Sequence, residues 1–183
     1  YLYQKDLKYR RQIIWHYENN FSGYKNSPSA NYEPILWFSK TDDYTYHQIR
    51  EPYKSTERLK NKITKNGKIW TPHPEGKHAG DVWNIPVLAG KIFAKEKVEH
   101  PTQKPLAICD RIIKHFSNEN DLVLIPFGGS GSECVSAVKN NRNFIAFEKN
   151  RDYIKIANNR LQELNVNNQI EIKINTNGIL AEI

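Results

Sequence analysis

The chain has 183 residues, of which 27 are Lys or Arg and 20 are Asp or Glu, so its formal net charge is +7 at pH 7. That length suits one α/β domain, or most of one, with a core that needs no cross-links. A mean hydropathy of −0.74 and the lack of any apolar run near ~18 residues exclude a membrane-spanning helix. The two cysteines, Cys109 and Cys134, are too few for a disulfide framework or a zinc cage, so we expect a reducing, cytoplasmic setting.

The first part of the chain is aromatic and basic, contains no methionine and opens at Tyr1. We therefore expect that a further segment precedes it. Two strands are predicted here, at residues 12–17 (QIIWHY) and 34–39 (PILWFS), because both runs are rich in β-branched and aromatic residues. A polar stretch rich in Asn, Ser, Gly and Pro separates them.

Residues 41–99 show no sustained helical or strand period and hold much of the basic charge. Seven basic residues fall between Arg50 and Lys68, close to Tyr53, Ile69 and Trp70. We interpret this stretch as an irregular insert on a sheet edge. From charge alone, a solvated face and a surface for a polyanionic partner are equally well supported.

From residue 100 onward, apolar residues alternate between strand-like and helix-like periods. We predict helices at 105–117, 132–140 and 151–164 and strands at 121–125, 143–148 and 169–174. Asn150 is a candidate helix cap, and the run at 121–125 (DLVLI) is expected to be buried on both faces. This order is a βαβαβ unit, whose crossovers imply a parallel sheet and an α/β fold.

The glycine turn at residues 127–131 (FGGSG) separates a predicted strand from a predicted helix. Glycines at this place let the backbone approach a ligand closely, and the helix N-terminus presents free N–H groups. Glu148 ends the next predicted strand, where an acidic residue can bind ribose hydroxyls. A plain glycine turn is the alternative, but this arrangement favours a ribose-bearing cofactor. The turn has neither the third glycine of a dinucleotide fingerprint nor the Gly-Lys-Ser/Thr of a phosphate-binding loop.

The segment at residues 100–105 (HPTQKP) makes the pattern more specific. HPTQKPL, PFGGSGS and NFIAFEKNRDYIKIANNRL together resemble the C-terminal half of the amino-methylating DNA methyltransferases of restriction–modification systems. These enzymes act on adenine N6 or cytosine N4, and in one permuted group the catalytic motif comes first and the cofactor motifs last. The resemblance is strong over 100–164, moderate over 11–40 and only positional over 41–99.

The resemblance implies a Rossmann-like S-adenosylmethionine-dependent methyltransferase sheet, mostly parallel with helices on both faces, that is incomplete in this chain. It divides the chain into sheet-edge strands of the core (1–40), a target-recognition insert (41–99) and the cofactor-binding βαβαβ part of the core (100–183). In the family, the catalytic strand lies beside the strand that ends here at Ile125, whereas the strands near Ile13 and Ile35 lie at the far edge. The chain would then supply both flanks of one sheet without the strands between them.

The resemblance also implies site residues. Thr102, Gln103 and Lys104 would help to hold the amino-acid end and the ribose of S-adenosylmethionine, and Glu148 would bind the ribose. The cofactor loop and the start of its helix would comprise Phe127, Gly128, Gly129, Ser130, Gly131 and Ser132. No metal site is predicted, because the histidines have no metal-ligand spacing.

Two departures from the family pattern have consequences. Ile125 stands where the family usually has an acidic residue, and losing this partner of the donor's ammonium group weakens binding by about 1–3 kcal/mol. The catalytic tetrapeptide Asp/Asn/Ser-Pro-Pro-Tyr/Phe does not occur, so no catalytic residue is predicted in this chain. We expect the tetrapeptide upstream of Tyr1 or on a complementary chain, and we expect the 183 residues alone to be inactive.

The predicted function is site-specific methyl transfer from S-adenosylmethionine to adenine N6 in duplex DNA, with residues 41–99 reading the major groove. The candidate DNA contacts are Arg50, Lys54, Arg58, Lys60 and Lys62, and Trp70 and Trp83 flank the same insert. Three alternatives stay open: a cytosine-N4 enzyme, an inactive remnant that binds DNA or the donor, and a methyltransferase acting on RNA or protein. The expected partners are duplex DNA, the missing segment or chain and, as a further alternative, a second copy of this chain; no membrane is expected.

Overall fold

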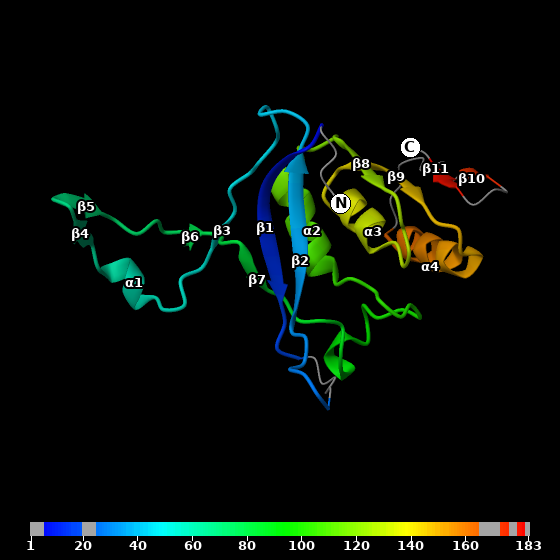
Figure 1. The fold of residues 1–183 in the computed structure, drawn as a ribbon, viewed down its shortest axis with the longest axis horizontal. Helices are drawn as coiled ribbons and strands as arrows, with labels where there is room; N and C mark the ends of the chain where they lie inside the picture. Colours follow the sequence, from blue (N-terminus) through cyan, green and yellow to red (C-terminus); the bar gives the residue numbers. More distant parts are fainter. Residues whose placement is uncertain (1–5, 20–24, 165–172, 176–178, 182–183) are drawn as a thin grey trace.

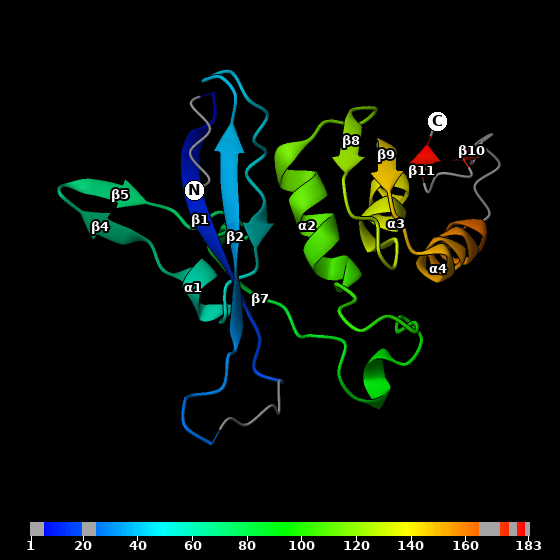
Figure 2. The same cartoon turned by 45° about the vertical axis from the view of Figure 1, so that its right-hand side comes forward.

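The computed structural model describes residues 6–19, 25–164, 173–175 and 179–181 of the chain. Two small sheets lie on either side of helix α2 (Leu106–Phe116), and a long arm projects from the first sheet (Figures 1 and 2). Within these residues, no helix is both long and apolar enough to cross a membrane.

The first sheet contains β1 (Lys8–His16), β2 (Tyr32–Ser39) and β7 (Val82–Asn84) in the order β2-β1-β7. Strands β1 and β2 form an antiparallel pair in which Ile13 lies opposite Ile35, and β7 pairs with β1 in parallel. Both strands predicted in this region are confirmed, although each begins a few residues earlier than predicted. The insert thus leaves the sheet after β2 and returns to it at β7.

The second sheet contains β8 (Leu122–Ile125), β9 (Asn143–Phe147), β10 (Lys173–Asn175) and β11 (Ile179–Ala181) in the order β10-β11-β9-β8. Helices α3 (Ser132–Lys139) and α4 (Arg151–Gln162) follow β8 and β9, as predicted. Strands β8 and β9 are parallel, but β11 runs antiparallel to β9 and to β10. Strand β10, the described end of the predicted last strand, thus runs in the same direction as β9 but is separated from it by the antiparallel β11, which was not predicted. Residues 169–172 of the predicted strand lie outside the described residues.

Burial of β8 differs from the prediction. Ile125 is 6% exposed, whereas Leu122 and Leu124 are each 61% exposed. Successive side chains of a strand point to opposite faces, and nothing in the described part of the chain covers the face that carries the two leucines. The expectation that this strand is buried on both faces is therefore wrong.

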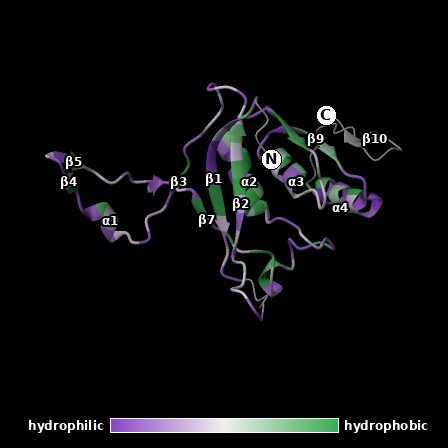
Figure 3. Cartoon of the chain, viewed as in Figure 1, coloured by the Kyte–Doolittle hydropathy of each residue, from purple (hydrophilic) through white to green (hydrophobic). Residues whose placement is uncertain are grey.

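Helix α2 joins two hydrophobic clusters. Ile108 and Cys109 pack with Ile13, Trp15 and other residues around the first sheet. Farther along the same helix, Ile113 packs into the cluster formed by β8, β9, α3 and α4. Figure 3 shows hydrophobic residues along the second part of β1 and along much of β2 and α2.

A groove of about 480 Å³ runs between β2 and β8 across α2. Pro34 and Ile35 of β2, Ile112 of α2, and Leu124 and Ile125 of β8 line it. Both β2 and β8 are end strands of their sheets in the described residues. Each of these strands therefore has an unpaired edge at this apolar groove. The two sheets, which the sequence analysis predicted as the flanks of one larger sheet, lie on opposite sides of the groove.

The arm (residues 50–78) contains most of the basic insert. Its neck is the antiparallel pair β3 (Arg50–Glu51) and β6 (Lys77–His78), and beyond it lie helix α1 (Glu57–Lys60) and the hairpin β4 (Ile63–Lys65) and β5 (Lys68–Trp70). A short 3-10 helix η1 (Lys91–Phe93) lies between β7 and α2. The insert is therefore more regular than its sequence indicated, because short paired strands carry too little periodicity to be recognised.

Candidate functional site

The glycine turn links β8 to α3 and lies close to the end of β9. The Gly128 N–H donates to the Phe147 carbonyl at 2.8 Å, and the Gly131 N–H donates to the Gly128 carbonyl at 2.8 Å. Gly131 has φ +74°, and a Cβ at this position would lie 2.6 Å from the Ala157 Cβ of α4. Only glycine fits there, because both the left-handed backbone and the close helix α4 disfavour a side chain.

Glu148, which we expected to bind a ribose, accepts a hydrogen bond from the backbone at the glycine turn. Its Oε2 accepts the Gly129 N–H at 2.8 Å, and its Oε1 accepts the Asn150 N–H at 2.8 Å. Asn150 in turn caps α4, since its side chain accepts the N–H groups of Asp152 and Tyr153. The carboxylate therefore connects the turn after β8 with the start of the helix after β9.

The serines of the turn point inward. Ser130 is 4% exposed and Ser132 is fully buried. The Ser132 hydroxyl donates to the Lys104 carbonyl at 2.8 Å, and the Arg160 guanidinium donates to the Ser130 carbonyl at 2.7 Å. These hydrogen bonds join the turn to the segment before α2 and to helix α4.

The segment at residues 100–105 packs against the glycine turn. The His100 ring lies 4.3 Å, centroid to centroid, from the Tyr153 ring, and its Nε2 would lie 3.1 Å from a Cβ at Gly129. Burial lowers the pKa of His100, against the opposing effect of the nearby Glu148 carboxylate. His100 and Tyr153 are therefore part of the site, and sequence reasoning missed both.

The three cofactor residues predicted in this segment lie in different settings. Gln103 uses both ends of its amide within the segment, accepting the Val98 N–H and donating to the Glu96 carbonyl, each at 2.8 Å. Lys104 Nζ donates to Glu33 of β2 at 2.9 Å, and Thr102 is exposed at the rim of a 280 Å³ hollow. Gln103 thus shapes the segment, and it lines the hollow together with Thr102 and Lys104.

Phe127 and Ile125 lie at the other side of the turn. Phe127 is 88% exposed, and both residues line the groove between β2 and β8. Lys104 lines that groove as well as the 280 Å³ hollow, so the two spaces meet near its side chain.

The two cysteines are poorly suited to act as nucleophiles. Among the described residues, no three His, Cys, Asp or Glu side chains gather as metal ligands. Cys109 and Cys134 are both buried free thiols, and burial raises the pKa of Cys134 to about 12. Thiols that stay protonated are poor nucleophiles.

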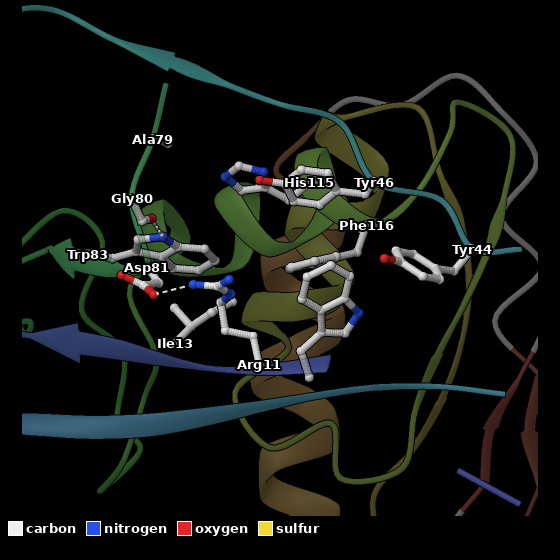
Figure 4. A pocket seen from close by; sticks show the side chains of 11 residues that line it. Arg11, Ile13, Tyr44, Tyr46, Ala79, Gly80, Asp81, Trp83, His115 and Phe116 are labelled. Carbon is white, nitrogen blue, oxygen red and sulfur yellow. Dashed lines mark hydrogen bonds and ion pairs between the residues drawn. The ribbon is translucent and has the colours of Figure 1, made fainter. Parts of the chain in front are cut away.

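Aromatic side chains pack the insert against the C-terminal end of α2. The His115 ring stacks on Tyr46 and on Trp83, with centroids 5.6 and 5.5 Å apart, and the walls enclose a 360 Å³ pocket (Figure 4). The His115 Nδ1 donates to the His47 carbonyl at 2.7 Å, and burial lowers the pKa of His115. Trp83 is 2% exposed, so it belongs to the core and cannot contact DNA.

The predicted DNA contacts whose side chains are described differ in their surroundings. Arg50 donates to the Gly76 carbonyl at 2.8 Å across the neck, and Lys60 is paired with Glu57. Lys54 and Lys62 are exposed, and the side chain of Arg58 lies outside the described part of the structure. Arg50 therefore holds the arm together, whereas Lys54 and Lys62 face solvent.

Comparison with known proteins places this geometry in a family. A model described as "DNA methylase" (N6_N4_Mtase) matches residues 1–159. The chain is 39% identical over 176 residues to Type II methyltransferase M1.MboII of Moraxella bovis, covering 91% of this chain and 68% of that protein. It is 34% identical over 156 residues to the DNA adenine methyltransferase YhdJ of Escherichia coli (strain K12), covering 83% of this chain and 52% of that protein.

Solved structures show the same relationship. The chain resembles the M1.HpyAVI–SAM complex with a TM-score of 0.59 and 27% identity, covering 86% of this chain and 64% of that one. It also resembles the cytosine-N4-specific PvuII DNA methyltransferase with a TM-score of 0.55 and 19% identity, a likeness of fold alone. The fold is thus the Rossmann-like methyltransferase fold, and the chain spans roughly half to two thirds of the length of these proteins.

Proposed function

The chain belongs to the DNA methylase family, and from that premise we propose that it carries the S-adenosylmethionine-binding and target-recognition parts of a DNA methyltransferase. We propose that the enzyme transfers the methyl group to the exocyclic N6 amine of adenine at specific sites in duplex DNA. The donor supplies an activated methyl group on its sulfonium, and this chain binds and orients the donor.

The observation that carries this proposal is the meeting of three segments that are distant in sequence. Glu148 binds the backbone of the glycine turn, His100 packs on the same turn, and Ser132 binds the Lys104 carbonyl. Backbone N–H groups at a helix start, a carboxylate at a strand end and a lining cation together suit a nucleoside that carries an amino acid. M1.HpyAVI, which has the same fold, was solved as a complex with SAM.

Adenine is the proposed target base rather than cytosine. The support is the similarity to YhdJ, which is a DNA adenine methyltransferase and is 34% identical over most of this chain. The cytosine-N4-specific PvuII enzyme is less similar, at 19% identity. Cytosine N4 is therefore the second candidate.

We also propose that additional strands occupy the groove between β2 and β8. The free edges of these two strands face one apolar space, and an unpaired edge is a template for further pairing. Leu122 and Leu124, each 61% exposed, would be covered by elements packed on β8. A segment upstream of Tyr1 or a complementary chain would supply these strands together with the catalytic tetrapeptide; a second copy of this chain is the alternative.

A transfer assay with labelled S-adenosylmethionine and duplex DNA tests the proposed function. We expect no transfer by the 183 residues alone, and transfer by a longer form that extends upstream of Tyr1. Mass spectrometry of the digested DNA should then detect N6-methyladenine. N4-methylcytosine would contradict the choice of base, absence of transfer by the longer form would contradict the enzyme, and transfer by the 183 residues alone would contradict the need for added strands.

A further inference from the structure

An ion pair between Glu33 and Lys104 lies where the groove between β2 and β8 meets the 280 Å³ hollow. Lys104 Nζ lies 2.9 Å from Glu33 Oε2, and both side chains line both spaces. Glu33 belongs to β2, whereas Lys104 precedes α2. The first sheet thus places a negative charge directly beside a cation of the candidate donor site.

Buried neighbours hold the two side chains in position. Glu33 lies opposite Trp15 in the antiparallel register of β1 and β2. The Lys104 ammonium lies 5.3 Å from the centre of the Trp15 ring, which is 3% exposed and donates its indole N–H to the Ile85 carbonyl at 2.7 Å. The Lys104 carbonyl accepts the Ser132 hydroxyl at 2.8 Å. The ion pair is therefore tied both to the first sheet and to the start of α3.

The same ion pair remains partly exposed. The side chain of Lys104 is 39% exposed and that of Glu33 is 43% exposed. Ion pairs in contact with solvent contribute little to stability, because water screens the two charges. A ligand that carries both an ammonium and a carboxylate can therefore replace the pair at little cost, and neither side chain is left without a partner of opposite charge.

Other side chains near the turn are less suited to bind a cation. Ile125 has no charge to offer at the end of β8, and both oxygens of Glu148 already accept backbone N–H groups. Glu133 lines the groove, but burial raises its pKa, which disfavours its charged form. Among the described residues that line the hollow, Glu33 carries the only carboxylate.

We propose that Glu33 of β2 binds the ammonium group of the donor's amino-acid end, while Lys104 binds its carboxylate. One ion pair within the protein is then exchanged for two ion pairs with the donor, so every charge keeps a partner of opposite sign. Glu33 supplies from the first sheet the negative charge that Ile125 lacks. The inference rests on the proposed function and names the residue that selects a donor with an amino group.

Isothermal titration calorimetry with three compounds tests each half of this exchange. S-adenosylmethionine carries both charged groups, its decarboxylated form keeps the amine, and 5′-methylthioadenosine lacks the whole amino-acid end. Glu33→Gln should weaken binding of the first two by about tenfold, because their ammonium loses a charged partner. It should bind 5′-methylthioadenosine as the unmodified chain does, which also shows that the site is intact. Lys104→Met should weaken binding of S-adenosylmethionine but not of its decarboxylated form.

Glu119→Gln is the control, because Glu119 is an exposed carboxylate between α2 and β8, and its affinities should match those of the unmodified chain. Equal affinities of Glu33→Gln and Glu119→Gln for the decarboxylated compound would overturn the assignment of Glu33. So would an equal loss of 5′-methylthioadenosine binding in Glu33→Gln, or a selective loss in Glu133→Gln instead. These results leave the proposed function standing, whereas an unmodified chain that binds none of the three compounds contradicts both proposals.

Discussion

Gly131→Ala is expected to raise the Kd for S-adenosylmethionine by about tenfold or more. A left-handed backbone costs a residue with a Cβ about 1–2 kcal/mol. Because the turn can relax this strain in the free chain but must regain its present conformation to bind the donor, the strain is added to the binding free energy, of which each 1.4 kcal/mol is about tenfold in affinity. The new methyl group would also lie 2.6 Å from the Ala157 Cβ and 3.0 Å from its Cα. Helix α4 or the turn would have to shift, and the backbone groups offered to the donor would move with it. Isothermal titration calorimetry measures the change.

Gly80→Ala is the control. Gly80 lies in the insert, outside the residues predicted to bind the donor, and a Cβ there would have nothing within 4 Å. We expect its Kd to stay close to that of the unmodified chain, and both variants should keep cooperative thermal unfolding. Equal Kd values for the two variants would show that packing of the turn on α4 does not control donor binding.

Glu148→Gln is expected to weaken donor binding by roughly 5- to 150-fold, which corresponds to about 1–3 kcal/mol. Both carboxylate oxygens accept backbone N–H groups, one from Gly129 and one from Asn150, at 2.8 Å each. An amide has one oxygen, so its NH₂ group would face one of these N–H donors. The turn would lose a bond, and the donor's ribose would lose a negatively charged acceptor.

Asp152→Asn provides the comparison for this change. Asp152 is an exposed carboxylate in the first turn of α4, four residues after Glu148. Its side chain forms an ion pair with Lys155 at 3.1 Å. Surface pairs of this kind contribute little, so we expect no change in donor affinity. If Glu148→Gln binds the donor as tightly as Asp152→Asn does, Glu148 does not bind the ribose.

The second half of the fold could be predicted because its signals are local. Apolar periodicity placed α2, α3 and α4 within about two residues, and Asn150 caps α4 as its residue type indicated. The exposure of Leu122 and Leu124 could not be predicted, since an apolar strand has the same sequence whether or not a neighbour covers it. Strand β11 was missed for a similar reason: three residues carry no period, and pairing with β9 decides their conformation.

The part of the candidate site that lies at the ends of β8 and β9 could be predicted from the sequence. The glycine turn and Glu148 meet as expected, because parallel strands β8 and β9 end at the same edge. Arg160, which donates to the Ser130 carbonyl, was missed, since it lies 30 residues away on α4 and no local pattern marks it. Arg50 was assigned to DNA from its charge alone, whereas its hydrogen bond to the Gly76 carbonyl depends on the pairing of β3 with β6.

Calorimetric titration of the chain with S-adenosylmethionine, alongside 5′-methylthioadenosine, measures occupancy of this site most directly. The second compound keeps the nucleoside but lacks the amino-acid end that we propose Thr102 and Lys104 help to hold. We predict one saturable site for S-adenosylmethionine per chain and weaker binding of 5′-methylthioadenosine. No heat with either compound, or equal affinity for both, would contradict the assignment of the glycine turn and its neighbours to this donor.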